Sequence, residues 1–410
     1  MKSSKPLGLI AAEPQFARLL AAAFISGLGD QINQVAVLAL VLALTHSGFA
    51  VAASLAARLA AYVAVGPLAG VLADRVSRRA ILVASDLGRA LLALAFIFAN
   101  TSHQVWLVYL TIAALEGLSA LFAPARTAAI PTLVRADNVI RANALDQSTL
   151  GVVMALGALA GGVLVAFVGS NIAFVTNSLS FVVSAALIAG MHIPRVSHRV
   201  QPSRDRRFRD VWPLIRASPV LRLVLALFAA WPVAGGAMNV LISVYGYSVF
   251  RAHALGVGLL YGALGAGLML GGLTSGYLSR NLSLYLKQVA AGSFVIEGAC
   301  YFLTSRAPSL WLAAAGLLVA TFVAGAGNIC TTTLLMQNAQ DAVRGRIVAV
   351  ADTASNGGLF AGMLGTGALL AVVAPRTVGS AAGIALAAVG AVLSGLVRKM
   401  PAEDDDALPC

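Results

Sequence analysis

Long apolar runs separated by short polar segments dominate the chain. A helix that crosses the hydrocarbon core of a bilayer needs about 20 predominantly apolar residues. Segments of about that length lie at 17–44, 49–73, 80–99, 104–123, 144–168, 171–192, 221–248, 254–279, 287–304, 309–331, 347–373 and 377–397. The pattern predicts an all-α membrane protein with twelve transmembrane helices.

The longest polar break divides these segments into six and six. It covers 193–220 and includes the basic run Arg204–Asp210, which suits either a topology-determining linker or contact with anionic lipid headgroups. We expect two pseudo-symmetric six-helix bundles at 1–192 and 221–400, joined by this basic linker and followed by an acidic tail at 401–410. Two six-helix halves are typical of alternating-access carriers built from repeats.

Composition supports the membrane assignment. The chain of 410 residues is 59% hydrophobic and only 11% charged, whereas soluble domains carry about 25% charged residues. This excludes a soluble enzyme, a disordered protein and a disulfide-rich secreted domain. The net charge of +12 resides in loops between apolar runs, which argues against a nucleic acid partner.

The distribution of Lys and Arg predicts the orientation. Of the 28 basic residues, only Arg251, Arg306 and Arg376 fall in loops on one side, and Arg58 and Arg89 fall inside spans. The others lie on the opposite side, which the positive-inside rule makes cytoplasmic. We therefore expect a multi-pass protein of the bacterial cytoplasmic (inner) membrane with both termini in the cytoplasm.

A glycine-lined helix end meets a basic cluster between the second and third spans, where Gly66–Arg79 reads GPLAGVLADRVSRR. An acid here lies near the positive N-terminal end of a helix. The arginines can bridge to an acid or to helix C-termini. We expect a conformational latch that holds the outward-facing state and breaks when the cytoplasmic side opens. Its predicted members are Gly70, Asp74, Arg75, Arg78, Arg79 and Asp86.

This run resembles the loop signature G-x-L-A-D-R-x-G-R-[RK] of the major facilitator superfamily, with Ser77 in place of the second glycine. Together with Gly29-Asp30, the stretches 122–145 and 337–346 resemble the branch of enterobactin-exporter-like and macrolide-efflux-like permeases. The resemblance covers nearly the whole chain. It implies the major facilitator fold and export of small molecules coupled to proton entry. In the antiporter motif G-P-x-x-G-G, however, Ala158 replaces the proline.

Ionisable residues inside spans are candidates for function, because each costs about 2.5–3.5 kcal/mol at the centre of a spanning helix. Asp30 and Arg58 lie at similar depth in adjacent spans, so we expect that they can pair. Asp30 is then a proton carrier, a structural partner of Arg58 or a direct cation ligand. Glu116 is the next candidate for a proton or cationic-substrate site, against a buried structural role. The proton-coupling candidates are Asp30, Glu116 and Arg58.

Glu297 also lies inside a span. The ninth span tends to be peripheral in the superfamily that the chain resembles, so we expect a structural or interfacial role for this acid. Spans 1, 4, 7 and 10 usually line the cavity there. Uncharged polar residues within spans provide the substrate-cavity candidates, which are Asn33, Gln34, Asn177, Asn239 and Asn328.

The sequence offers no His/Cys/Asp/Glu cluster at metal-ligand spacing, no phosphate-binding GxxxxGK[ST] loop and no GxSxG motif. We expect no enzyme activity, catalytic residue, metal site or cofactor. The expected function is proton-coupled efflux of small amphipathic compounds, drug-like or siderophore-like, by alternating access. Expected partners are the substrate, protons and membrane lipids, with the protein acting as a monomer. Three alternatives remain: a lysolipid flippase or solute importer of the same fold, a metal-ion exporter, and a non-transport membrane sensor or scaffold.

Overall fold

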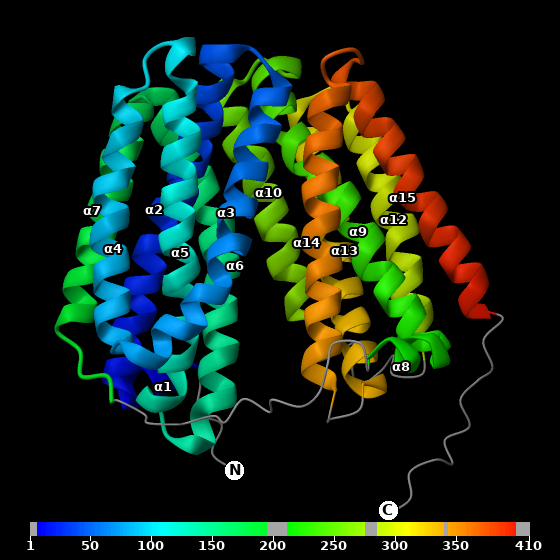
Figure 1. The fold of residues 1–410 in the computed structure, drawn as a ribbon. Helices are drawn as coiled ribbons and strands as arrows, with labels where there is room; N and C mark the ends of the chain where they lie inside the picture. The colour runs from blue at the N-terminus through cyan, green and yellow to red at the C-terminus, as the bar shows by residue number, and fades with distance from the viewer. Residues whose placement is uncertain (1–5, 195–210, 275–284, 340–342, 399–410) are drawn as a thin grey trace, which may run out of the picture.

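The computed structural model describes residues 6–194, 211–274, 285–339 and 343–398, which are almost entirely helical and contain no strand (Figure 1). An N-terminal group of helices comprises α1 (Pro6–Ala12), α2 (Pro14–Thr45), α3 (Gly48–Arg75), α4 (Arg78–Ala95), α5 (Val105–Leu133), α6 (Val139–Phe167) and α7 (Ser170–Ala189). A C-terminal group comprises α8 (Val211–Ala217), α9 (Pro219–Val244) with a π-helical extension at Tyr245–Val249, α10 (His253–Leu273), α12 (Leu286–Arg306), α13 (Leu310–Asn338), α14 (Arg344–Leu369) and α15 (Pro375–Arg398).

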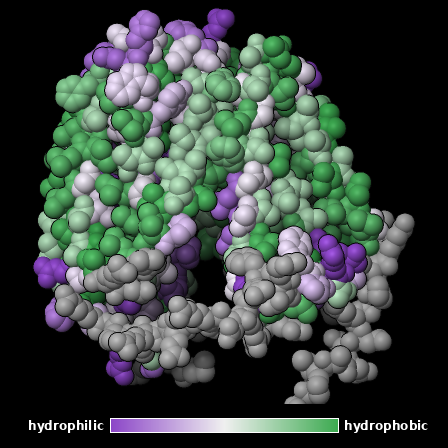
Figure 2. Space-filling view, in the orientation of Figure 1, coloured by the Kyte–Doolittle hydropathy of each residue, from purple (hydrophilic) through white to green (hydrophobic). Residues whose placement is uncertain are grey.

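Eleven of these helices are long and apolar enough to cross a membrane. The helix α12 is not among them, because Lys287, Gln288, Glu297 and Arg306 dilute its apolar character. It nevertheless packs closely between α13 and α15 as a member of the same bundle. Figure 2 shows a broad hydrophobic band with hydrophilic side chains gathered toward both ends of the molecule. These features confirm the all-α membrane fold.

Several helix boundaries differ from the prediction. The fourth span was expected to end at 123, but α5 continues to Leu133 through Pro124 and Pro131. Prolines are tolerated in membrane helices, because neighbouring helices and local adjustments satisfy the freed backbone groups. The short helices α1 and α8 were not predicted, and α8 occupies part of the expected linker. Residues 195–210 of that linker and the acidic tail at 401–410 lie outside the described residues.

Glycines let the helices cross at backbone contact. A Cβ added at Gly258 of α10 would lie 2.6 Å from the Cα of Gly162 in α6. Within the C-terminal group, a Cβ at Gly362 of α14 would clash with the carbonyl oxygen of Val233 in α9. Small residues at such crossings allow the close van der Waals packing on which membrane helix association depends.

The two groups of helices meet mainly through α6 with α10 and through α3 with α14. The start of α3 meets the end of α14 at the end of the molecule opposite α1 and α8 (Figure 1). Gly48, the first residue of α3, lies there against Leu370, the residue that follows α14. At the end near α1 and α8, Figure 2 shows a hollow between the two groups. The molecule is therefore closed at one end and open at the other.

Candidate functional site

A cavity of about 850 Å³, open to solvent, lies between the two groups of helices. Seven helices line it: α2, α3, α5, α6, α9, α10 and α14. Its polar lining residues are Gln31, Gln34, Arg58, Tyr62, Glu116, Asn239 and Tyr261. Its apolar lining residues are Leu55, Leu59, Met154, Leu264, Leu359 and Met363. The cavity thus offers apolar surface together with several hydrogen-bonding groups.

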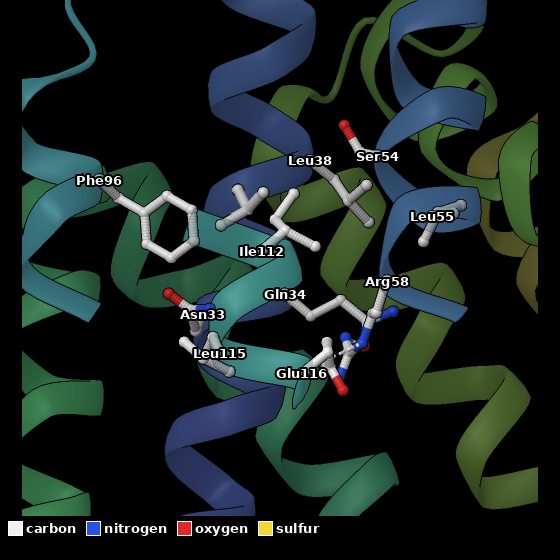
Figure 3. Close-up of a pocket in the computed structure, with 11 residues that line it drawn as sticks. Asn33, Gln34, Leu38, Ser54, Leu55, Arg58, Phe96, Ile112, Leu115 and Glu116 are labelled. Atoms are coloured by element: carbon white, nitrogen blue, oxygen red, sulfur yellow. Dashed lines mark hydrogen bonds and ion pairs between the residues drawn. The ribbon is translucent and has the colours of Figure 1, made fainter. Parts of the chain in front are cut away.

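An ion pair anchors the polar side of this cavity. The Nε atom of Arg58 lies 2.5 Å from Oε1 of Glu116, and its Nη1 donates a hydrogen bond of 2.8 Å to Oε1 of Gln34 (Figure 3). The expected pairing of Arg58 with Asp30 is therefore wrong. The reason is packing: α3 lies extensively against α5, which carries Glu116, and only slightly against α2, which carries Asp30.

A smaller pocket of about 360 Å³ extends from the same ion pair into the N-terminal group (Figure 3). It shares Gln34, Arg58 and Glu116 with the central cavity and adds Asn33 and Ser54 among apolar neighbours. The Oδ1 atom of Asn33 is buried and has no hydrogen-bond partner among the described residues. Gln34 thus lines both spaces, whereas Asn33 lines only the smaller pocket.

Asp30 belongs to a separate charge cluster within the N-terminal group. Its Oδ2 atom lies 3.6 Å from Nη1 of Arg89, which also forms an ion pair with Asp86. The Arg89 guanidinium is 4.4 Å from the ring centroids of both Phe122 and Phe181. Arg89 is not among the functional residues predicted from the sequence. An arginine inside a span, three residues after an acid, is itself the signal that would have found it.

The predicted latch has a different arrangement in its described part. Asp86 is fully buried and pairs with Arg89 on its own helix, instead of bridging to Arg78 or Arg79. In this structure Asp86 therefore does not form the bridge to the latch arginines that the sequence suggested. Arg79 donates a hydrogen bond to the carbonyl oxygen of Ala189, the last residue of α7. The latch members Gly70, Asp74 and Arg75 lie in α3, but their side chains are outside the described set.

The three remaining cavity candidates lie in different parts of the molecule. Asn239 lines the central cavity, and its backbone oxygen accepts a 2.8 Å hydrogen bond from the Tyr261 hydroxyl. Asn177 is completely buried, and its side-chain oxygen Oδ1 lies against Gly29. It therefore belongs to the packing of α7 on α2 and not to the cavity. Asn328 lines another pocket, within the C-terminal group.

Glu297 lies in that same pocket, and only 1% of its surface is exposed. Both of its carboxylate oxygens accept hydrogen bonds from Nε1 of Trp231, at 3.0 and 2.9 Å. The Glu297 side chain thus faces the inside of the bundle, whereas Ile296 and Leu303 on the same helix are exposed. Among the described residues, no group of three or more His, Cys, Asp or Glu side chains is placed to hold a metal ion.

Comparison with known sequences identifies the family. The sequence profile of the Major Facilitator Superfamily matches residues 19–363. The chain is also 29% identical over 171 residues to "Uncharacterized MFS-type transporter YfiS" of Bacillus subtilis (strain 168). That alignment covers 42% of this chain and 40% of the relative.

Solved structures show the same fold. A mutant of the nucleoside transporter NupG superposes with a TM-score of 0.75 at 13% identity, covering 94% of this chain and 99% of the other. A bacterial homologue of the iron transporter ferroportin, in an inward-facing state, has a TM-score of 0.70 at 15% identity, with 93% and 98% covered. The family profile and the relative indicate a multi-pass membrane transporter rather than an enzyme. The chain belongs to the major facilitator superfamily.

Proposed function

We propose that this protein is a proton-coupled efflux transporter of small amphipathic compounds, drug-like or siderophore-like, which works by alternating access. The observation that carries the proposal is the central cavity between the two groups of helices. It is open near α1 and α8 and closed at the other end, where α3 meets α14. Carriers of this architecture expose a fixed midplane site to each side in turn by rocking one bundle against the other.

The lining of the cavity supports an amphipathic substrate. Leucine and methionine side chains provide apolar surface, and unbranched methionines adapt to ligands of different shape. The Arg58–Glu116 pair carries no net charge, and Gln31 and Asn239 add hydrogen-bonding groups from opposite sides of the cavity. A compound with an apolar body and a few polar groups satisfies this lining without leaving a buried charge unpaired.

The charge cluster around Arg89 supports proton coupling. One guanidinium serves two carboxylates, so the cluster carries an excess negative charge when both acids are ionised. A proton on one acid removes that excess inside the bilayer. Asp30 is the acid that exchanges it, because its side chain is 23% exposed whereas that of Asp86 is fully enclosed. Glu116 is the second candidate, since it lies in the cavity against Arg58.

The distribution of Lys and Arg and the motif between α3 and α4 support the orientation and the latch. Both termini are assigned to the cytoplasm of a bacterial inner membrane, so the open end in this structure is the cytoplasmic one. Gly70, Asp74, Arg75, Arg78 and Arg79 form the latch that breaks when this end opens. The transporter acts as a monomer surrounded by lipid, with substrate and protons as its partners and no nucleic acid.

The test is transport in proteoliposomes under an imposed pH gradient, with a lipophilic cationic dye, a macrolide and a catecholate siderophore as probes. Wild type is compared with Asp30→Asn and with Asp137→Asn, which neutralises an exposed acid outside the long helices. We expect gradient-driven movement to be lost in Asp30→Asn and kept in Asp137→Asn. Movement that persists in Asp30→Asn overturns the assignment of Asp30.

A solute importer of the same fold is the second candidate. The observation that favours it is the amide-rich lining, in which Gln31, Gln34 and Asn239 can hydrogen-bond a neutral polar solute. The same proteoliposomes separate the two functions. An exporter moves the probe against the direction of proton flow, whereas a proton-driven importer moves it in the same direction.

A further inference from the structure

A second, much smaller pocket lies inside the C-terminal group and shares no lining residue with the central cavity. The helices α9, α12 and α13 line it. Its polar lining residues are Trp231, Ser293, Glu297, Asn328 and Thr331. The proposed efflux mechanism above uses none of them.

Glu297 in this pocket differs from the other buried carboxylates. Glu116 pairs with Arg58, Asp146 pairs with Arg126, and Asp30 and Asp86 share Arg89. The described neighbours of the Glu297 carboxylate are instead neutral donors, the Trp231 indole and the Tyr301 hydroxyl. A buried carboxylate with no positive partner is unfavourable, so this site favours a bound positive charge.

The charged groups on the surrounding helices are distant. On α12, Lys287 and Arg306 are each about 14 Å or more from Glu297 along the helix axis. On α9, Arg222 is about 14 Å from Trp231 by the same measure. The helix α13 contains no Asp, Glu, Lys, Arg or His, and α15 carries arginines only at Arg376 and Arg398, near its two ends. The other titratable side chains of α12 and α13 are Cys300, Tyr301 and Cys330.

The hydroxyl groups of the pocket present lone pairs and not hydrogens. Ser293 Oγ donates its hydrogen to the carbonyl oxygen of Ala290 at 2.8 Å, and Thr331 Oγ1 donates to that of Gly327 at 2.9 Å. Both oxygens therefore remain as acceptors, alongside the Glu297 carboxylate, and the Asn328 side chain also lines the pocket. An oxygen-rich pocket with one negative charge suits a small hard cation. A single carboxylate balances one positive charge.

We propose that this pocket is a cation-coupling site in the C-terminal group, which takes a monovalent cation, a proton or Na⁺, on Glu297. The helix α9 carries Trp231 at this pocket and Asn239 at the central cavity. A cation bound in the pocket can therefore affect substrate binding in the cavity through α9. The role of this site in transport rests on the proposed function above. The binding itself does not.

Trp231 provides the readout, since its indole N–H binds the carboxylate directly. The three other tryptophans, Trp106, Trp212 and Trp311, are replaced by phenylalanine. Emission of the purified protein is then recorded against Na⁺ at fixed pH, with choline holding the ionic strength, and against pH without Na⁺. We expect a saturable spectral change that is absent in Glu297→Gln, an isosteric variant that keeps an acceptor for the indole.

The variant Thr331→Val distinguishes a site for Na⁺ from a site for a proton. It removes one oxygen ligand but preserves side-chain shape. If the site takes Na⁺, this variant weakens the Na⁺ response by about tenfold or more, in the range seen for lost partners of metal ligands. If the site takes a proton, the pH response persists in Thr331→Val and Na⁺ has no effect.

An emission spectrum that responds to neither pH nor Na⁺ overturns the site and makes Glu297 a permanently neutral structural acid. Identical responses in wild type and Glu297→Gln, both eluting as folded monodisperse protein, also overturn it. A saturable response in a protein that moves no probe in proteoliposomes leaves this site standing and removes the proposed efflux function.

Discussion

The Arg89 guanidinium lies between two aromatic rings and beside two carboxylates, all within the N-terminal group. Its planar shape lets it stack on Phe122 and Phe181 while its edges reach Asp30 and Asp86. Lysine is a point charge on a flexible stem and cannot make both kinds of contact. The cluster therefore requires an arginine at this position and not just any positively charged residue.

Arg89→Lys tests this at the residue scale. We expect a loss of unfolding free energy of about 1–3 kcal/mol, because stacking on both rings and one of the acidic contacts are lost. Thermal unfolding in detergent measures it, with Arg79→Lys as a control at an exposed position. Equal melting temperatures for wild type and Arg89→Lys would contradict the stacked arrangement.

The Arg58–Glu116 pair yields a second prediction at this scale. Arg58→Gln leaves Glu116 without its positive partner, and we expect a loss of about 2 kcal/mol. This is below the value for a fully buried pair, because one third of the Arg58 side chain is exposed. The double variant Arg58→Gln/Glu116→Gln should recover part of the loss, since no unpaired charge remains. A double variant less stable than Arg58→Gln would show that the pair does not couple.

At the scale of helices, glycines determine how closely neighbours approach. On α14, Gly362 faces the backbone of α9, whereas Gly365, three residues later, has nothing within 4 Å of an added Cβ. Two glycines of one helix therefore have opposite environments. The sequence does not distinguish them, because both stand in the same apolar stretch.

We expect Gly362→Ala to destabilise the protein by about 1–3 kcal/mol, because the added methyl forces α9 and α14 apart. Gly365→Ala is the matched control and should be neutral or slightly stabilising, since alanine favours helix over glycine. Comparing the unfolding midpoints of the two variants in the same detergent tests this difference in stability. Similar destabilisation by both would contradict the assigned crossing.

At the scale of the whole molecule, the contact between α3 and α14 closes one end of the central cavity. A Cβ at Gly48 would lie 3.2 Å from the Cβ of Leu370. This is within a few tenths of an ångström of the about 3.5–4.5 Å that a disulfide requires. Alternating access demands that this end open during each cycle.

Gly48→Cys/Leu370→Cys is therefore expected to form a disulfide and to stop transport, with activity restored by reductant. The background replaces Cys300, Cys330 and Cys410, and the two single-cysteine variants serve as controls. Transport at the wild-type rate with the disulfide fully formed would show that this contact does not need to open.

Much of the fold could be read from the sequence. Runs of about 20 apolar residues predict spanning helices because lipid provides no hydrogen-bonding partner for the backbone. Eleven of the predicted segments meet that requirement in the structure. Depth within a span could also be estimated, which is why Asp30, Arg58 and Glu116 were singled out as buried charges. Helix ends were less accurate, as the continuation of α5 through two prolines shows.

The partners of those charges were decided by tertiary structure alone. Depth along a helix does not specify which face a residue occupies or which neighbour lies there. Thus Arg58 joins Glu116, Arg89 joins Asp30 and Asp86, and Glu297 is left with Trp231. The chain by itself determined that the protein spans a membrane and carries acids within it. The rotation and packing of the helices determined which of the described buried acids pair with an arginine and that Glu297 does not.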